Sequence, residues 1–364
     1  MNEKNNNNRQ LVLPLISDCE IEYKEIVKQN WKFTFSRQYL TSVNTKRVIG
    51  LIIAQMKEEG EMRDFYQVRA ADIIRKTDVA KEEVYRTMRE TIFELVNVAF
   101  FFEDAKNHEI IPRHLLDTTR FENPASYKNG VLTVALNPTL RDIIMQLAHY
   151  SQFELDSYMN FSSWYSMRLW ELLSAFKDTG WWYSPIEEYR ELMGCGIAYD
   201  NKGNQRKEKD GSVKYMKYQN NSMMIKKTTA EPIIDFVGSD LEFVVNPVYE
   251  ERSGRGRPRI IGVRFDLVFH QLSAIEKIEY WSAKNEKFAK AVARLQAWGV
   301  SNENIVKYTH AIGRERVNQL LYSWQMKNTS KDPIGNKLVY CNKAFVAEGK
   351  KAIEARNKAT GATK

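Results

Sequence analysis

The same order of hydrophobic patterns occurs twice between residues 20 and 271, and this repeat constrains the fold more than any other feature of the sequence. Each copy begins with an apolar helical stretch, continues with a short extended segment and two further helical stretches, and ends in strand patterns. Apolar residues at every third or fourth position indicate a helix with one buried face, and alternation indicates a half-buried strand. This order is typical of a winged helix-turn-helix, and its recurrence predicts a tandem arrangement.

The first copy covers residues 20–150. The patterns predict a helix over Thr45–Glu58, a strand over Asp64–Arg69, helices over Ala70–Lys76 and Lys81–Leu95, strands over Val96–Phe102, His108–Leu115 and Gly130–Leu136, and a helix from Asn137 to Leu147. Thr77 and Asp78 separate the two central helices and are suited to turning and capping.

The second copy covers residues 151–271 and keeps the order, although few residues are identical between the copies. The patterns predict helices over Ser162–Lys177, Pro185–Met193 and Asn220–Val237, an extended segment over Trp181–Ser184, and a strand pair over Leu241–Glu250 and Ile260–Phe269. A long polar insertion, Ile197–Val213, separates the second and third of these helices.

The two ends of the chain differ from this repeat. Residues 1–19 form a polar, Asn-rich segment that we expect to be disordered. Residues 272–364 predict a basic helical extension, with helices over Ala274–Trp298, Asn302–Thr309, Arg314–Met326 and Leu338–Asn357. The sequence therefore predicts an α+β protein with two tandem winged helix-turn-helix domains, 20–150 and 151–271, followed by that extension.

The net charge of +8 is unevenly distributed. Residues 272–364 hold 17 basic and 8 acidic side chains, whereas the first 271 residues are nearly neutral. Within that neutral part, Lys202–Lys227 has 8 basic and 2 acidic residues, and Arg252–Arg264 has five arginines and no acid. Such local clustering is typical of polyanion binding rather than of a generally soluble surface.

The predicted helix Asn220–Val237 holds the strongest candidate contact residues. Asn220, Asn221 and Ser222 can cap its start. If Ile225, Thr229, Ile233 and Phe236 or Val237 face inward, then Lys226, Lys227 and Thr228 project outward together. Recognition helices in the major groove use these residue types in their N-terminal turns. A solvated helix face with two lysines is the alternative, and Pro232 should kink the helix or mark its boundary.

A second candidate is the arginine-rich turn of the predicted hairpin, which holds Arg252, Arg255, Arg257 and Arg259. Its Arg-Gly-Arg-Pro core resembles an AT-hook, in which glycine lets the backbone approach a narrow minor groove. We therefore expect this turn to enter an A/T-rich minor groove. An ordinary glycine-rich turn is the alternative, but it does not explain five arginines without an acid.

The first copy offers a weaker candidate. Lys81, Tyr85, Arg86 and Arg89 lie at helical spacing, but Glu82, Glu83 and Glu90 share the same helix, so an ordinary charged surface explains them equally well. The tryptophans fall on apolar helix faces or strand starts, which indicates core packing rather than base stacking.

Several function classes lack their signatures. The sequence contains no GxxxxGK[ST] phosphate loop, and its five histidines form no His-x-His pair. Its three cysteines (Cys19, Cys195 and Cys341) form no CxxC pair, which predicts a reducing, cytoplasmic compartment and no zinc site. No apolar run reaches the length of about 18 residues that a membrane span requires. We therefore expect no enzymatic activity and no cofactor.

Three segments together resemble the Rep_3 family of plasmid replication initiators, which bind DNA repeats called iterons. Ser163–Leu173 resembles the family's S-x-Y-S-x-R-L-Y-E-L-L helix, with Trp170 in place of the usual tyrosine. Ile225–Ile234 resembles the proline-bearing helix that follows, and Ile261–Leu267 the strand that closes the wing. The resemblance implies binding to double-stranded origin repeats, local opening of A/T-rich DNA, recruitment of the host initiator and replicative helicase, and repression of the protein's own gene.

Two other functions stay open at this stage. A winged-helix transcription repressor of a mobile element would share every DNA-binding feature. A rolling-circle nickase is disfavoured by the missing histidine pair. The sequence also leaves open whether the chain acts as a monomer or a homodimer.

Overall fold

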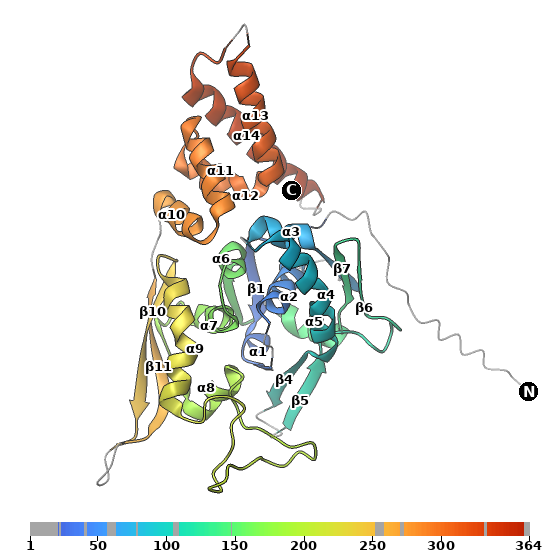
Figure 1. Cartoon of the computed structure of the whole chain (residues 1–364), viewed down its shortest axis with the longest axis vertical. Helices are drawn as coiled ribbons and strands as arrows, with labels where there is room; N and C mark the ends of the chain where they lie inside the picture. Colours follow the sequence, from blue (N-terminus) through green and yellow to red (C-terminus); the bar gives the residue numbers. More distant parts are fainter. Residues whose placement is uncertain are drawn as a thin grey trace, which may run out of the picture. The chain divides into compact units, whose positions relative to one another are not determined.

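The structure is a computed structural model that describes residues 21, 23–39, 42–56, 63–77, 79–104, 109–146, 148–251, 258–269, 273–330 and 333–359. The tail 1–19 that the sequence predicts to be disordered lies outside these residues. The chain divides into two compact units (Figure 1). The first contains the described residues up to Phe269, apart from the short segments 75–78 and 238–240, which group with the residues after Phe269 in the second unit.

The first winged helix has the predicted order of elements. It consists of α2 (Val43–Gln55), β3 (Phe65–Arg69), α3 (Ala70–Lys76), α4 (Lys81–Asn97), β6 (Ala125–Lys128) and β7 (Val131–Ala135). The three strands form an antiparallel sheet in the order β3-β7-β6. Asn129 and Gly130 join β6 to β7 with positive φ angles of 51° and 78°, which suits the two-residue hairpin turn that Asn-Gly favours.

The three strands predicted after α4 are all present, but they belong to two different sheets. The first two strands predicted after α4 are β4 (Ala99–Asp104) and β5 (Glu109–His114), and they form a separate sheet with β2 (Arg37–Gln38). The wing is β6–β7, of which the sequence analysis predicted β7 and missed β6. The sequence analysis did not assign the wing of this copy, because a strand pattern does not identify its partner.

Further elements of this unit lie before the first winged helix and between the two winged helices. They are β1 (Ile26–Asn30), α1 (Trp31–Thr34), α5 (Pro138–Met145), β8 (Tyr150–Glu154) and α6 (Leu155–Met159). Strand β1 pairs antiparallel with β8, from Ile26 opposite Glu154 to Asn30 opposite Tyr150. Asn137 caps α5, with Pro138 at its start as predicted.

The second winged helix repeats the arrangement. It consists of α7 (Trp164–Ser174), β9 (Trp181–Pro185), α8 (Ile186–Leu192), α9 (Asn221–Phe236), β10 (Leu241–Tyr249) and β11 (Ile260–Phe269), with the strand order β10-β11-β9. Helix α9 continues through Pro232 to Phe236, so the proline does not mark its end. The predicted fold class, two tandem winged helices and a helical C-terminal region, is therefore confirmed.

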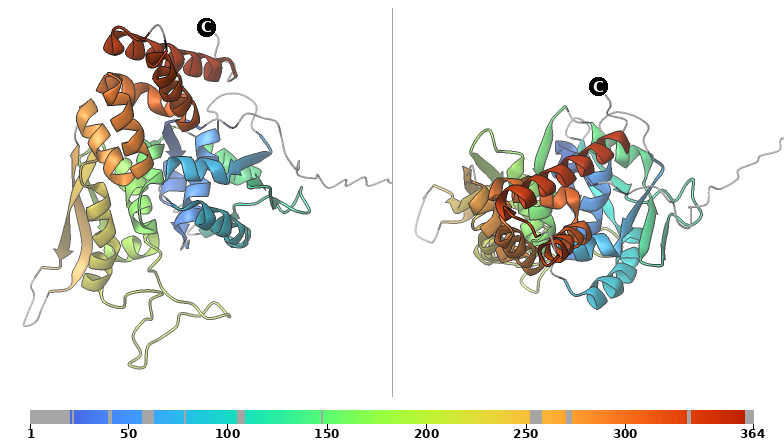
Figure 2. Two further views of the ribbon diagram at one scale, coloured as in Figure 1. Left: turned by 45° about the horizontal axis from the view of Figure 1, so that its top comes forward. Right: turned by 90° about the horizontal axis from the view of Figure 1, so that it is seen from above.

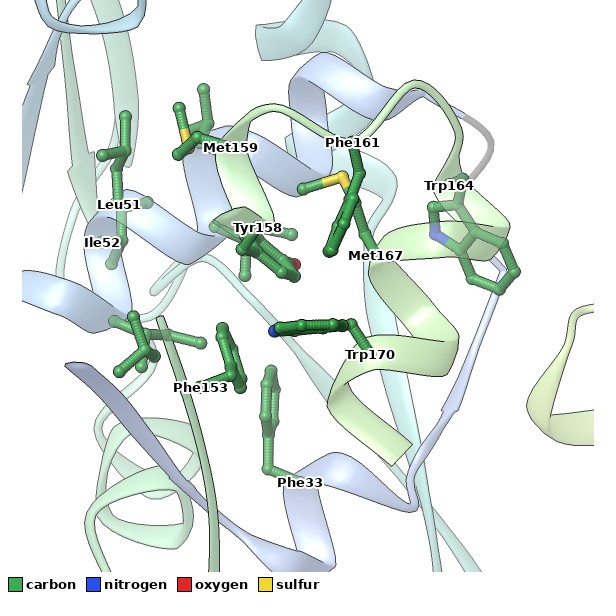
Figure 3. Packing of buried hydrophobic residues seen from close by; sticks show 14 of the residues in the cluster. Phe33, Leu51, Ile52, Phe153, Tyr158, Met159, Phe161, Trp164, Met167 and Trp170 are labelled. Atoms are coloured by element: carbon green, nitrogen blue, oxygen red, sulfur yellow. The ribbon is translucent and has the colours of Figure 1, made fainter. Parts of the chain in front are cut away.

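The two winged helices share one hydrophobic core. Figure 3 shows Phe33 of α1 in one cluster with Phe153 of β8, Tyr158 of α6, Phe161, and Trp170 of α7. Between the two regions, the Phe35 and Phe176 ring centroids lie 5.8 Å apart, edge to face. Each fully buried aromatic side chain contributes roughly 1.5–3 kcal/mol relative to its exposed state. The shared core therefore joins the two winged helices into one body.

A buried charged cluster strengthens this connection. Lys46 Nζ on α2 lies 2.9 Å from Glu171 Oε2 on α7, and Arg168 Nη1 lies 3.3 Å from the same oxygen. Arg168 also donates to the carbonyl oxygens of Thr34 (2.6 Å) and Ser36 (2.7 Å) in the first half of the chain. Burial lowers the pKa of Lys46 to about 8. Arg168 and Glu171 lie in the segment that carries the family resemblance, and both have a structural role.

The second unit has its own helical core. After Phe269 follow α10 (Ala274–Lys284), α11 (Glu286–Ala297), α12 (Asn302–Ile312), α13 (Arg314–Asn328) and α14 (Lys337–Ala359). Leu295, Ile305, Val317 and Phe345 are fully buried within it. The single helix predicted over Ala274–Trp298 is wrong, because Asn285 adopts an extended backbone and caps α11 instead. None of the described helices combines the length and the apolar character that crossing a membrane requires.

Candidate nucleic-acid interface

Helix α9 is held firmly against the second winged helix. The Asn220 side chain accepts a hydrogen bond from Met223 N and so caps the start of the helix, as the sequence predicts. At the other end, the Phe236 ring packs edge to face on Trp170, with centroids 4.7 Å apart, and stacks on Phe161 at 5.3 Å. These contacts fix both ends of the helix, so its solvent face has a defined direction.

That face carries Lys226 and Lys227, which are both exposed. Neither forms an ion pair among the described residues, so both ammonium groups can bind an external acceptor. Ser222, Met223 and Ala230 are also exposed on α9. The sequence analysis did not select Met223 and Ala230, because neither has a polar side chain that marks a contact residue.

Thr228 is a correction. The sequence analysis placed it outward with the two lysines, but it is fully buried. Its hydroxyl lies 2.8 Å from the Tyr189 hydroxyl on α8 and donates to Met224 O at 3.0 Å. Ile233, predicted to face inward, is instead 46% exposed. The rotation of α9 is set by Ile225, Thr229 and Phe236, which are buried as predicted.

Asn221 is bound within the fold. Its Oδ1 accepts from Arg190 Nε (2.9 Å) and Nη2 (2.7 Å), and its Nδ2 donates to Ile260 O at 3.4 Å. Arg190 is fully buried on α8, and Ile260 begins β11. Asn221 therefore positions the start of α9 against both α8 and the wing. Sequence reasoning missed Arg190, because it lies among exposed glutamates on a short helix.

The arginine-rich turn is described only in part. Arg252, Arg255 and Arg257 lie outside the described residues. Arg259 is exposed, and its backbone N–H donates to Glu250 Oε1 at 3.1 Å while its carbonyl accepts from Glu250 N at 3.0 Å. The backbone of Arg259 is thus fixed where the turn meets β11, one residue before the Asn221 contact at Ile260.

The candidate face of the first winged helix is on α4. Lys81, Tyr85, Arg86 and Arg89 are all exposed there. Tyr85 packs over the β6–β7 turn, since a Cβ on Gly130 would lie 3.0 Å from its ring. The turn also presents the exposed Lys128, which the sequence analysis missed because it did not identify β6.

The α4 face contains acids as well. Glu82 and Glu83 in its first turn and Glu90 further along are exposed beside the basic residues. The tryptophan prediction is confirmed for Trp164, Trp170 and Trp182, which are buried, but Trp181 is 46% exposed with Arg264 Cζ 4.8 Å from its ring centroid.

Within the described parts of the chain, no three His, Cys, Asp or Glu side chains gather into a group that could hold a metal ion.

Comparisons with known proteins agree with this geometry. The family described as "Initiator Replication protein, WH1" matches residues 26–174, which covers the first winged helix and α7. Among solved structures, the crystal structure of Pi initiator protein in complex with iteron DNA is similar. The TM-score is 0.53 and the sequence identity 16%, over 69% of this chain and 100% of that chain. At this identity the likeness shows the fold. The search of curated proteins finds no match.

Proposed function

We propose that the chain, which belongs through residues 26–174 to the initiator replication protein family, binds double-stranded DNA repeats at a plasmid origin and initiates replication there. The observation that carries the proposal is the solvent face of α9, where Lys226 and Lys227 are exposed near a capped helix start. Lysines in the first turns of such a helix can bind guanine or phosphate in the major groove.

The proposal assigns different tasks to the residues of this interface. Ser222, Lys226 and Lys227 contact base edges or nearby phosphates, and the Asn220 cap keeps the start of α9 in place. The arginine-rich turn with Arg259 enters the adjacent minor groove, an assignment supported by its sequence. Lys81, Tyr85, Arg86 and Arg89 on α4 contact the backbone of the same DNA.

Further parts of the proposal rest on the family. The chain acts by binding and not by catalysis, in the cytoplasm. It recruits the host initiator and replicative helicase, and it represses its own gene by occupying the same repeats. We also propose residues 20–150 and 151–271 as the two DNA-binding domains.

Footprinting the DNA beside the chain's own gene tests the proposal. We expect protection of tandem direct repeats, spaced by whole helical turns, next to an A/T-rich tract. Protection of one isolated inverted repeat would favour a dimeric transcription repressor. Supercoiled origin DNA incubated with the protein and a divalent metal serves as the control for catalysis, because relaxed circles would indicate a nickase.

A further inference from the structure

The connection between α8 and α9 is much longer than the corresponding connection in the first winged helix. Only residues 77–80 separate α3 from α4, whereas residues 193–220 separate α8 from α9. Residues 197–215, which we call the arm, project from the second winged helix at the end where α9 begins (the yellow-green segment in Figures 1 and 2). This placement puts the arm beside the N-terminal turns of α9.

The arm has a defined structure. Its three segments meet in a ring of backbone hydrogen bonds, from Ala198 N to Lys214 O (2.9 Å), Lys214 N to Arg206 O (2.9 Å) and Arg206 N to Ala198 O (2.8 Å). Two tight turns close its ends, and the carboxylates of Asp200 and Asp210 accept backbone N–H groups within them. Backbone N–H groups lower the pKa of Asp200, and the Ser212 hydroxyl together with the Ser212 N–H lowers the pKa of Asp210.

The base of the arm is fixed to both helices. The Tyr215 ring stacks under Arg190, whose Cζ lies 3.8 Å from the ring centroid, and the Tyr215 hydroxyl donates to Glu187 Oε1 at 3.0 Å. Arg190 also donates to Cys195 O, where the connection begins, and to Gln219 O, where it ends. Because the same guanidinium holds Asn221, the arm and the start of α9 are positioned by one buried side chain.

The positive charge of the arm is available to a partner. Lys202, Lys207 and Lys209 are exposed and form no ion pair with any described residue. By contrast, Lys214 forms an ion pair, with its Nζ 3.6 Å from Glu208 Oε1. The exposed arm residues are predominantly polar, whereas the core of a protein–protein interface is depleted of charged residues and enriched in aromatic ones. A phosphate backbone is the partner that this chemistry fits.

We infer that the arm is a separate DNA-contacting element, which binds phosphate groups beside the major groove that α9 enters. The inference rests on the proposed function, because it takes its direction from α9. Arg190 is the positioning residue that sets the arm relative to the recognition helix. Since phosphate contacts are independent of sequence, the arm increases affinity for all DNA and adds no discrimination.

The triple variant Lys202→Ala, Lys207→Ala, Lys209→Ala in the full chain tests the inference. The dependence of log affinity on log salt should become shallower by about 0.9 for each phosphate that the variant no longer binds, hence by about 2–3 in total. Affinity for the repeats and for random DNA should fall by the same factor. The matched control replaces the same three lysines with arginine, which keeps the charge and should keep the wild-type slope.

A second variant replaces residues 198–214 with Asn-Gly, a two-residue turn that suits the antiparallel pair Ile197 and Tyr215 at the base of the arm. It should show the same shallower slope, and hydroxyl-radical footprints should lose protection of the sugar-phosphates that flank the α9 site. A wild-type slope in the alanine variant, or a loss confined to the specific DNA, overturns the inference. Failure of the wild-type chain to prefer the repeats overturns the proposed function instead.

Discussion

The two winged helices have the same order of elements but present different surfaces to a polyanion. The N-cap residue of α4 is Ala80, which offers no side-chain cap, and the first turn carries Glu82 and Glu83. Helix α9 begins with the Asn220 cap and has no acid in its first turn. Because a helix N-terminus favours anions, the acids in the first turn of α4 repel a phosphate there, whereas the first turn of α9 presents no acid. Helix α9 is therefore the better suited of the two to enter a groove that is lined by phosphates.

The connection that precedes α4 also differs from the one that precedes α9, and again the second winged helix has the additional basic residues. In the first winged helix only residues 77–80 lie there, whereas the second has the arm and the buried Arg190 that holds it. Nevertheless the two winged helices are not independent bodies, since one core and one charged cluster span them. We expect the two surfaces to act on one DNA with different tasks.

The largest expected effect is a loss of stability when the charged cluster between the two winged helices is broken. Glu171→Ala leaves Lys46 and Arg168 buried without their carboxylate, which should cost about 3–5 kcal/mol of unfolding free energy. Chemical denaturation measures this loss, and Glu231→Ala on the exposed face of α9 is the control, with a change within about 0.5 kcal/mol. A loss below about 1 kcal/mol for Glu171→Ala would mean that the cluster does not join the two halves.

The same cluster predicts a pH dependence. Burial lowers the pKa of Lys46 from 10.5 to about 8, so the folded chain releases this proton at lower pH than the unfolded chain does. The unfolded state then binds more protons, and stability rises with pH between about 8 and 10.5. Measured as the difference from Lys46→Met, the rise should be about 1–3 kcal/mol. A flat or falling difference over this window would contradict the assignment.

A smaller effect, on DNA affinity, is expected from substitutions in the first winged helix. Replacing Arg86 and Arg89 on α4 with alanine should weaken binding to the repeats and to random DNA alike, with a salt slope shallower by about 0.9 for each phosphate released from the interface. Titrations at several salt concentrations give both quantities. If discrimination falls and the slope does not change, α4 contacts bases and the distinction between the two winged helices is wrong.

The smallest expected effect is an increase in DNA affinity rather than a loss. Glu82→Gln with Glu83→Gln removes two acids from the start of α4, and affinity for any DNA should increase by about two- to fivefold as repulsion is removed. The increase should shrink at high salt. Unchanged affinity at low salt would remove the first winged helix from the interface.

Much of this architecture could be predicted from local sequence patterns. The order of elements in both winged helices, the Asn220 cap and the exposure of Lys226 and Lys227 follow from periodicity and capping rules. Strand β6 could also have been found, because Asn129-Gly130 between polar and apolar residues is a strong hairpin signal.

The remaining features depend on contacts between residues far apart in the sequence. Strand β1 pairs with β8, and nothing in either segment identifies the other. Thr228 is buried because the Tyr189 hydroxyl satisfies its own, a partner that helix periodicity does not reveal. Arg190 has the sequence context of a surface residue, and only the folded connection supplies the carbonyl oxygens that allow its burial.

The most direct test of the division of tasks compares the two winged helices in one experiment. The ratio of affinities for the footprinted repeats and for random DNA is measured for Lys226→Ala with Lys227→Ala and for Arg86→Ala with Arg89→Ala. Removing a base contact of α9 should cost about 1–3 kcal/mol on the repeats, so the lysine variant should lose discrimination while the arginine variant keeps the wild-type ratio. Equal weakening of both DNAs by the lysine variant, together with reduced discrimination in the arginine variant, would contradict the assignment of sequence recognition to α9.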